Sequence, residues 1–328
     1  MKVSELGEFA LIDLISDIVG KAKSPDVVLG VGDDAAVWRC ERSLQIGTTD
    51  SLVQDVHFDL DVATWRDLGW KALAVNISDI AAMGGIPQYA LVSLSLPLET
   101  EVECVTELCH GMVDIANEFS VDIVGGNITR SPVTVITLSV IGKAQAGSLL
   151  TRSAALAGDV VAVTGYLGQS AAGLRMLKSR LKFDDETTAY LKDAHLRPYP
   201  RVAQGQVLVE HGVKSAIDLS DGLLSDLAHI GEASGVAAKI WLDRLPVHHL
   251  VKSAFVDECP GMALSGGEDY ELLFTARDSI IEGISRSLAS PVTVIGEVVS
   301  GRPGAITLLD KDRRVVEWDG RGWDHFKE

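Results

Sequence analysis

The residues best suited to chemistry are aspartates set in short polar motifs. A glycine-rich segment ends in Asp34, and the hydroxyl pair Thr48-Thr49 precedes Asp50. The apolar residues between them predict two strands that turn near Glu41, a hairpin whose antiparallel pairing would set position 34 opposite about position 48. Carboxylates that meet there repel one another, so a divalent cation between them is expected. Each aspartate alone could instead cap a turn, and only their combination favours metal.

Asp79 is the most informative single residue, because it lies on the apolar stripe of a helix predicted over residues 65–83. At about 100° per residue, it falls within roughly 40° of Leu68, Ala72 and Val75. The carboxylate would also lie near the C-terminal end of the helix, where the dipole disfavours negative charge. A buried carboxylate in that place needs a strong partner, which is either a metal ion or the side chain of a Lys or Arg.

Two further motifs combine small residues with oxygen ligands. Gly125-Gly126 follows a short predicted strand, and paired glycines let backbone N–H groups approach a phosphate closely. Asp218 and the pair Ser220-Asp221 connect a predicted strand to a predicted helix. Taken alone, the glycine pair is typical of a turn, and Ser220 or Asp221 could simply cap the helix.

Other nucleotide-binding patterns are excluded. The segment Gly30–Ala35 matches the dinucleotide pattern GxGxxA, but no helix follows it, and its two aspartates would repel a pyrophosphate. The chain contains no Walker A motif, and its eight histidines show no metal-ligand spacing. The combination of aspartates and glycines therefore favours phosphate chemistry that depends on divalent metal.

Composition narrows the class of partner. The net charge is −17 and Lys and Arg form no cluster, which disfavours nucleic acid and anionic membranes as partners. The four cysteines form no CxxC pair, as is typical of reduced thiols in the cytoplasm. The N-terminal residues lack the apolar region of a signal peptide, and no apolar run is long enough to span a membrane.

The pattern of elements predicts a mixed α/β protein. Helical and strand-like segments alternate through all 328 residues, which suits two domains. Small residues cluster near 144–148 and place the expected boundary there, giving domains of residues 1–146 and 147–328. We expect a cytoplasmic enzyme with an ordinary globular core.

Taken together, the motifs resemble those of bacterial thiamine-monophosphate kinases, in the superfamily of aminoimidazole ribonucleotide synthetase and selenophosphate synthetase. The resemblance covers nearly the whole chain in order. The matching segments are Glu5-Leu6-Gly7-Glu8-Phe9, Gly32-Asp33-Asp34-Ala35-Ala36, Thr48-Thr49-Asp50, Val56-His57-Phe58, Trp70-Lys71-Ala72, Asn76-Ile77-Ser78-Asp79, Met83-Gly84-Gly85-Ile86-Pro87, Gly125-Gly126-Asn127, His195-Leu196-Arg197-Pro198, Asp218-Leu219-Ser220-Asp221-Gly222, Gly266-Gly267-Glu268-Asp269-Tyr270 and Gly322-Trp323.

This resemblance implies a two-domain fold, with an N-terminal ATP- and magnesium-binding domain whose sheet pairs across a homodimer. It implies ATP-dependent phosphorylation of thiamine monophosphate to thiamine diphosphate. Many relatives carry Asp where this chain has Asn127, whose amide oxygen binds magnesium less strongly. The implied magnesium ligands are Asp34, Thr48, Thr49, Asp50, Asp79, Asn127, Asp218 and Asp221; the implied ATP contacts are Gly125, Gly126, Arg152 and Ser220; the implied substrate contacts are His57, Glu268 and Trp323.

Charge agrees with this reading. The five aspartates Asp34, Asp50, Asp79, Asp218 and Asp221 carry −5 together, and ATP adds about −4, so several divalent ions are needed. Positioning of the two substrates and neutralisation of their phosphate charges would then support direct in-line transfer without a nucleophilic side chain.

The alternatives fit less well. Selenophosphate synthetase needs a reactive cysteine near the N-terminus, whereas the first here is Cys40, and the related carbamoyl-transferring maturation proteins end in a cysteine, whereas this chain ends in Glu328. A non-catalytic nucleotide-binding module is the other alternative, and the intact acidic set argues against it.

Overall fold

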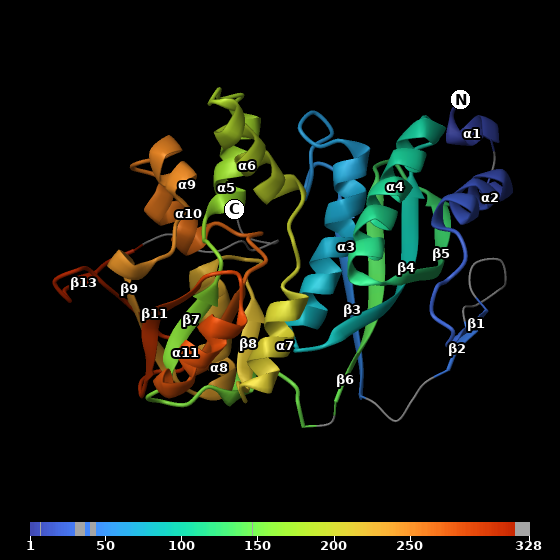
Figure 1. Ribbon diagram of the computed structural model, residues 1–328. Coiled ribbons are helices and arrows are strands. Elements are labelled where there is room, and N and C mark those ends of the chain that lie inside the picture. The colour runs from blue at the N-terminus through green and yellow to red at the C-terminus, as the bar shows by residue number, and fades with distance from the viewer. Residues whose placement is uncertain (7, 30–36, 40–43, 146, 319–328) are drawn as a thin grey trace. The chain divides into compact units, whose positions relative to one another are not determined.

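The computed structural model describes residues 1–6, 8–29, 37–39, 44–145 and 147–318 (Figure 1). The chain forms two compact units, one of residues 1–80 and 86–146 and the other of residues 81–85 and 147–328. Each unit has its own sheet and helices, so the predicted mixed α/β class is confirmed.

The first unit is built on a four-stranded sheet in the order β3-β6-β4-β5. β6 is antiparallel to both of its neighbours, whereas β4 and β5 are parallel and are connected by a helix, as parallel neighbours require. The elements of this unit are α1 (Val3–Leu6), α2 (Glu8–Val19), β1 (Val27–Leu29), β2 (Val37–Trp38), β3 (Leu44–Val53), α3 (Trp65–Ala82), β4 (Ile86–Leu96), α4 (Val102–Phe119), β5 (Asp122–Arg130) and β6 (Val135–Ala144).

Helices α3 and α4 cover one face of this sheet (Figure 1). Beneath them lie alternate residues of β6, Ile136, Leu138 and Val140, which are fully buried. The two helices pack closely because Gly69 has no side chain. A Cβ at that position would overlap the carbonyl oxygen of Leu108. This close packing fixes α3, and with it Asp79, against the sheet.

The hairpin predicted around residue 41 is wrong. β2 pairs with β1, while β3 pairs along all ten of its residues with β6. A two-residue strand cannot satisfy the backbone of a ten-residue one, whereas β6 offers a partner of equal length with an alternating apolar face. Asp34, the other half of the predicted pair, lies outside the described residues.

The second unit contains a seven-stranded sheet in the order β13-β12-β9-β11-β7-β10-β8. All of its pairs are antiparallel except β9 with β12. The strands are β7 (Val160–Thr164), β8 (Ser215–Asp218), β9 (Ala237–Trp241), β10 (Leu272–Ala276), β11 (Val292–Val299), β12 (Ile306–Leu309) and β13 (Val315–Val316); the helices are η1 (Arg152–Ala154), α5 (Gln169–Lys178), α6 (Asp185–Leu196), α7 (Val202–Glu210), α8 (Leu223–Ser234), η2 (Leu242–Arg244), α9 (His249–Ala254), α10 (Cys259–Ser265) and α11 (Asp278–Ser287).

Helices cover both faces of this second sheet. Leu273 of β10 belongs to a core that includes residues of α5 and α8, whereas Phe274, the next residue, faces a core that includes residues of α7 and α11. The central strands are therefore apolar on both sides, and their ends present the polar motifs. Among the described residues, no helix has the length and apolar character needed to cross a membrane.

Candidate active site

In the first unit, the structure brings Thr48 and Asp79 together. The Thr48 hydroxyl donates a hydrogen bond of 2.6 Å to Oδ2 of Asp79. Two residues along the strand, the backbone N–H of Asp50 donates to Oδ1 of Asn76 at 3.0 Å. Because strand side chains alternate, Thr48 and Asp50 both point to the face of β3 covered by α3. This face of β3 and one side of α3 thus share a group of oxygen atoms.

The environment of Asp79 is the one predicted from helical periodicity. Leu68, Ala72 and Val75 on the same stripe of α3 are buried, and Asp79 itself is half-buried. It lies within the last turn of α3, where the helix dipole opposes its charge. The short bond from Thr48 compensates part of that cost, and a cation would compensate more.

Thr49 differs from its neighbours. Its hydroxyl donates to the carbonyl oxygen of Leu138 at 2.9 Å and accepts from the Ser139 hydroxyl at 3.1 Å. Since it follows Thr48 in the strand, its side chain points to the opposite face of the sheet. The structure therefore does not bring the Thr49 hydroxyl together with Asp79.

The glycine pair lies inside a strand and not after its end, contrary to the sequence prediction. β5 continues to Arg130 because the eleven-residue β4 offers it partners on both sides of a register shift between Ile123 and Gly125, with Gly126 opposite Val92 and Asn127 opposite Ser93. A Cβ on Gly126 would overlap the Val92 carbonyl oxygen. Gly126 is therefore required for strand pairing, whatever else its backbone contacts.

Replacing Gly126 with Ala is expected to destabilise the protein by about 1–3 kcal/mol, the usual cost of forcing an extra methyl group into a packed site. Urea denaturation measures the change. Gly47→Ala is the matched control, because Gly47 lies in β3 of the same sheet and no atom lies within 4 Å of the position that its new methyl group would take. Equal stability of the two variants would contradict the packing argument.

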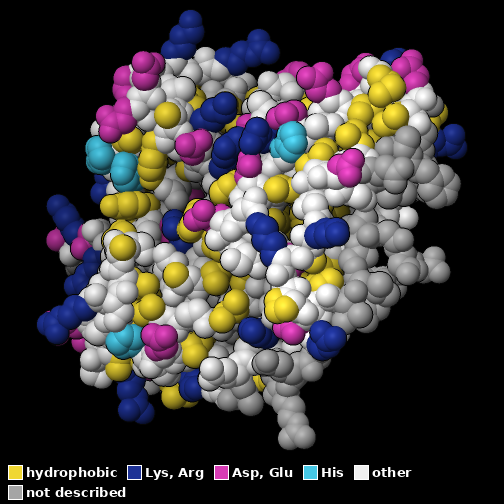
Figure 2. Space-filling view, turned by 45° about the vertical axis from the view of Figure 1, so that its right-hand side comes forward, with side chains coloured by type: hydrophobic (Ala, Val, Ile, Leu, Met, Phe, Trp, Pro, Cys, Tyr) yellow, Lys and Arg dark blue, Asp and Glu magenta, His cyan; other side chains and the backbone are white. Residues whose placement is uncertain are grey.

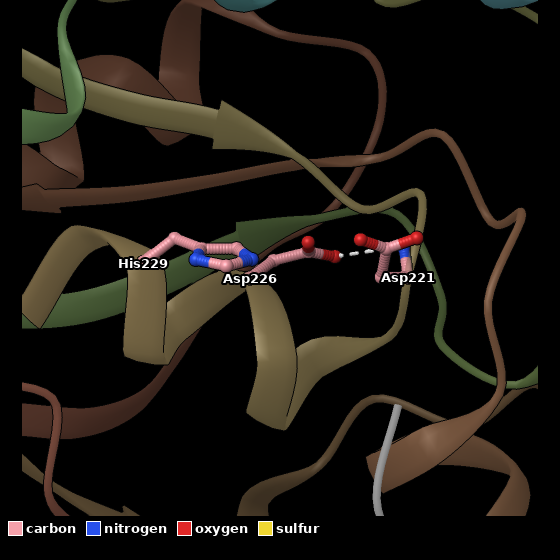
Figure 3. A group of neighbouring side chains, drawn as sticks. All are labelled: Asp221, Asp226 and His229. Atoms are coloured by element: carbon pink, nitrogen blue, oxygen red, sulfur yellow. Dashed lines mark hydrogen bonds between the residues drawn. The ribbon is translucent and has the colours of Figure 1, made fainter. Parts of the chain in front are cut away.

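In the second unit, three aspartates surround the connection from β8 to α8. Asp218 ends β8 and is 3% exposed, and Asp226 in the first turn of α8 is 1% exposed. Oδ2 of Asp226 accepts from the backbone N–H of Asp221 at 3.2 Å (Figure 3). It also accepts from the backbone N–H of Gly222 at 3.1 Å. The sequence reasoning missed Asp226; an aspartate in the first turn after the Asp221-Gly222 pair was the available signal.

The electrostatics of this group favour a cation. Burial, and then the negative charges of Asp218 and Asp221, raise the pKa of Asp226 to about 8. The ligand atoms of Asp221, Asp226 and His229 lie within 4.8 Å of one another (Figure 3). Carboxylate oxygens are the donors that magnesium prefers, so the chemistry of the set fits that ion.

The loop after α10 is bonded to the β8–α8 connection through its backbone. The Ser220 carbonyl accepts from Glu268 N–H at 2.8 Å, and the Leu219 carbonyl accepts from Tyr270 N–H at 2.9 Å. Glu268 and Tyr270 have φ angles of 65° and 49°, in the left-handed region that non-glycine residues rarely adopt. Two motifs that are separate in the sequence are therefore held side by side.

Two carboxylates next to Glu268 have structural partners. Asp269 accepts from Gly168 N–H at 2.6 Å and Ser170 N–H at 3.0 Å, and burial raises its pKa to about 7. Glu271, fully buried, accepts from Arg201 through Nε at 2.8 Å and through the terminal nitrogen at 2.5 Å. Glu268 is the carboxylate of this segment that keeps a partly exposed side chain.

Arg152 lies away from the β8–α8 connection. Its carbonyl accepts from the hydroxyl of Ser234, the last residue of α8, at 2.7 Å, and the preceding Thr151 bridges to Ser215, the first residue of β8. Ser220 follows the C-terminal end of β8 and precedes the N-terminal end of α8, so it lies at the opposite end of each element from Arg152. The twelve residues of α8 span about 18 Å, so the structure does not bring Arg152 and Ser220 together.

The remaining predicted site residues divide into two groups. His57 lies in the turn after β3, where its Nδ1 accepts from Val53 N–H at 3.1 Å. Trp323 and Asp34 lie outside the described residues.

Comparison with known proteins defines the class. Residues 32–144, which lie within the first unit, match the model of the AIR synthase related protein, N-terminal domain, so this unit is of the AIR synthase-related class. Thiamine-monophosphate kinase of Escherichia coli is 40% identical over 328 residues, with 98% of each chain covered. The chain belongs to the thiamine-monophosphate kinase family.

Solved structures of thiamine-monophosphate kinases have the same fold as this chain. The crystal structure of thiamine-monophosphate kinase from Stenotrophomonas maltophilia has a TM-score of 0.84 at 34% identity, over 94% of this chain and 98% of that one. A structure described as AaThiL complexed with AMPPCP and TMP has a TM-score of 0.77 at 32% identity, over 99% of both chains.

Proposed function

We propose that this chain transfers the γ-phosphoryl group of ATP to thiamine monophosphate, giving ADP and thiamine diphosphate. Two groups of oxygen ligands carry the proposal. In one unit, the Thr48 hydroxyl bonds the Asp79 carboxylate; in the other, Asp218 and Asp221 both lie close enough to Asp226 for their charges to raise its pKa. A family relative of the same fold is described as a complex with AMPPCP and TMP, which supports both substrates.

Magnesium fits these donors, because it prefers oxygen ligands and because the negative charges of the carboxylates otherwise repel one another. When bound, it supplies neutralisation of the phosphate charges. Thr49 would contribute through its backbone carbonyl, since its hydroxyl faces away from Asp79, and Asn127 through its weaker amide oxygen. The proposed ligands are Asp34, Thr48, Thr49, Asp50, Asp79, Asn127, Asp218 and Asp221.

The organic parts of the substrates need other contacts. We assign ATP contacts to Gly125, Gly126, Arg152 and Ser220, with Arg152 reaching a different part of the nucleotide from Ser220 because the two lie at opposite ends of α8. Thiamine monophosphate has a positively charged thiazolium ring, which suits a carboxylate partner. Its proposed contacts are His57, Glu268 and Trp323.

An ADP-release assay with ATP, magnesium and thiamine monophosphate tests the function, with chromatographic identification of thiamine diphosphate. We expect ADP and thiamine diphosphate in equal amounts, and no acceptor activity with aminoimidazole precursors. Nucleotide binding without any turnover would instead identify a non-catalytic module.

Transfer is expected to be direct and in line. The acceptor phosphate oxygen is already a competent nucleophile, so a phosphoenzyme would add a step without lowering the barrier. With γ-labelled ATP and no acceptor, the protein should remain unlabelled after denaturing separation, and a chiral γ-phosphorus should be inverted in the product. Stoichiometric label on the protein that is chased into thiamine diphosphate would overturn the direct route.

A homodimer through the first unit is expected. β3 is an edge strand in the described sheet, and most of its ten residues are exposed, which leaves backbone groups available for pairing. Light scattering at micromolar concentration should give twice the chain mass of 35.0 kDa. A mass that stays at 35.0 kDa across a concentration series would count against the dimer.

We expect neither nucleic acid nor a membrane as partner, and a cytoplasmic location. The net charge is −17, and on the face drawn in Figure 2 the Lys and Arg side chains lie in small groups among acidic and apolar ones. Phosphate backbones and anionic lipids require a more continuous basic surface.

A further inference from the structure

Glu268 is held in an unusual backbone conformation. Its φ of 65° is a left-handed value that costs a non-glycine residue energy and persists only where the surroundings fix it. One fixing contact is the hydrogen bond from its N–H to the Ser220 carbonyl. The side chain is 29% exposed, so its carboxylate is accessible to a ligand.

His195 lies behind this carboxylate. It is 5% exposed in the last turn of α6, and its Nδ1 lies 3.4 Å from Oε2 of Glu268 and 3.0 Å from the Ser170 hydroxyl. A carboxylate only accepts hydrogen bonds, so Nδ1 can bond Glu268 only as a donor, in the state with the proton on that nitrogen. With that proton in place, both Glu268 and Ser170 accept from the same ring nitrogen.

Ser170 connects this pair to the next residue of the loop. Its backbone N–H donates to Asp269, whose carboxylate also accepts from Gly168. Glu268 and Asp269 are adjacent in the chain, so the contacts form a closed circuit from Asp269 through Ser170 and His195 back to Glu268. A circuit of this kind restricts the rotamer of Glu268 as well as its backbone.

We propose that His195 is a positioning residue for the thiamine substrate: it holds the Glu268 carboxylate toward the cationic ring and does not touch the substrate itself. This inference rests on the proposed function and on Glu268 as a substrate contact. A side chain that is already held in its binding conformation loses less conformational entropy when the ligand binds, so binding is tighter. Losing His195 should therefore weaken binding of thiamine monophosphate and leave binding of ATP unchanged.

The test compares five variants by steady-state kinetics with each substrate varied. His195→Phe keeps a ring of similar size without a donor and should raise KM for thiamine monophosphate about tenfold, the size expected when a hydrogen bond to a charged group is lost. KM for ATP should not change. His195→Asn, whose amide can donate from nearly the same position, should recover most of the loss. His211→Ala is the control, because His211 also bonds a serine, Ser287, at 3.1 Å.

The last two variants, Glu268→Gln and the double variant His195→Phe with Glu268→Gln, separate positioning from general damage. If His195 acts only through Glu268, adding His195→Phe to Glu268→Gln should raise KM for thiamine monophosphate no further, because the two changes share one pathway. Additive effects, or equal rises in KM for both substrates, would overturn the inference. Absence of thiamine-monophosphate phosphorylation by the wild-type protein would defeat the proposed function instead. Melting temperatures of all variants identify any that fail to fold.

Discussion

Asp79→Asn is expected to leave the protein folded and to lower its turnover roughly 10²–10³-fold, the usual cost of losing one preorganised electrostatic group. Asn keeps the shape of the side chain, and its amide can still accept the hydrogen bond from Thr48. What disappears is the negative charge at the end of α3. Because that charge is disfavoured by the helix dipole, the variant should be at least as stable as the wild type in the absence of metal.

The measurement is kcat for ADP release at saturating magnesium, together with the melting temperature. Asp67→Asn is the control on the same helix, because Asp67 is more deeply buried than Asp79 and accepts from the hydroxyl of Thr64, the residue just before α3. That variant should lose stability and retain turnover. Wild-type turnover in Asp79→Asn would assign Asp79 to helix packing alone.

Removal of divalent cations should have a still larger effect. Excess EDTA is expected to abolish ADP release, and added magnesium should restore it, because the acidic groups of this chain and the phosphates of ATP repel one another without a cation. Full activity in excess EDTA would refute the metal assignment. Circular dichroism in EDTA establishes that the fold survives, so that loss of activity reports the site and not unfolding.

A second readout needs no turnover. A cation that binds only the folded state raises the melting temperature as its concentration rises. Magnesium should therefore stabilise the wild type without ATP, and less so Asp79→Asn and Asp218→Asn. If magnesium shifts all three proteins equally, its binding does not involve these carboxylates.

Elements whose signals are local could be predicted from the sequence. The helix predicted over residues 65–83 is found at Trp65–Ala82, because its apolar stripe ends just before Gly84, which adopts a left-handed conformation with φ of 68°. The hairpin around residue 41 failed because strand pairing is non-local: β3 pairs with a strand that follows two helices and two strands later.

The site residues likewise divide into those whose signal is local in the sequence and those whose role depends on distant partners. Asp79 could be placed by helical periodicity, and the bond from Thr48 then gave it a partner in the structure. The roles of Asp269 and Glu271 could not be predicted, because they depend on partners such as Arg201, 70 residues from Glu271. Spacing alone cannot distinguish a carboxylate that binds a ligand from one that holds a loop.

The long separation between β3 and β6 also has a consequence for biosynthesis. Thr49 and Ser139, which are bonded across the two strands, are 90 residues apart in the chain. At about 5–20 residues per second of translation, β3 leaves the ribosome roughly 5–20 s before its partner strand is made. Throughout that interval its backbone donors and acceptors are unpaired, so the nascent chain exposes an aggregation-prone strand that a cellular chaperone would have reason to bind.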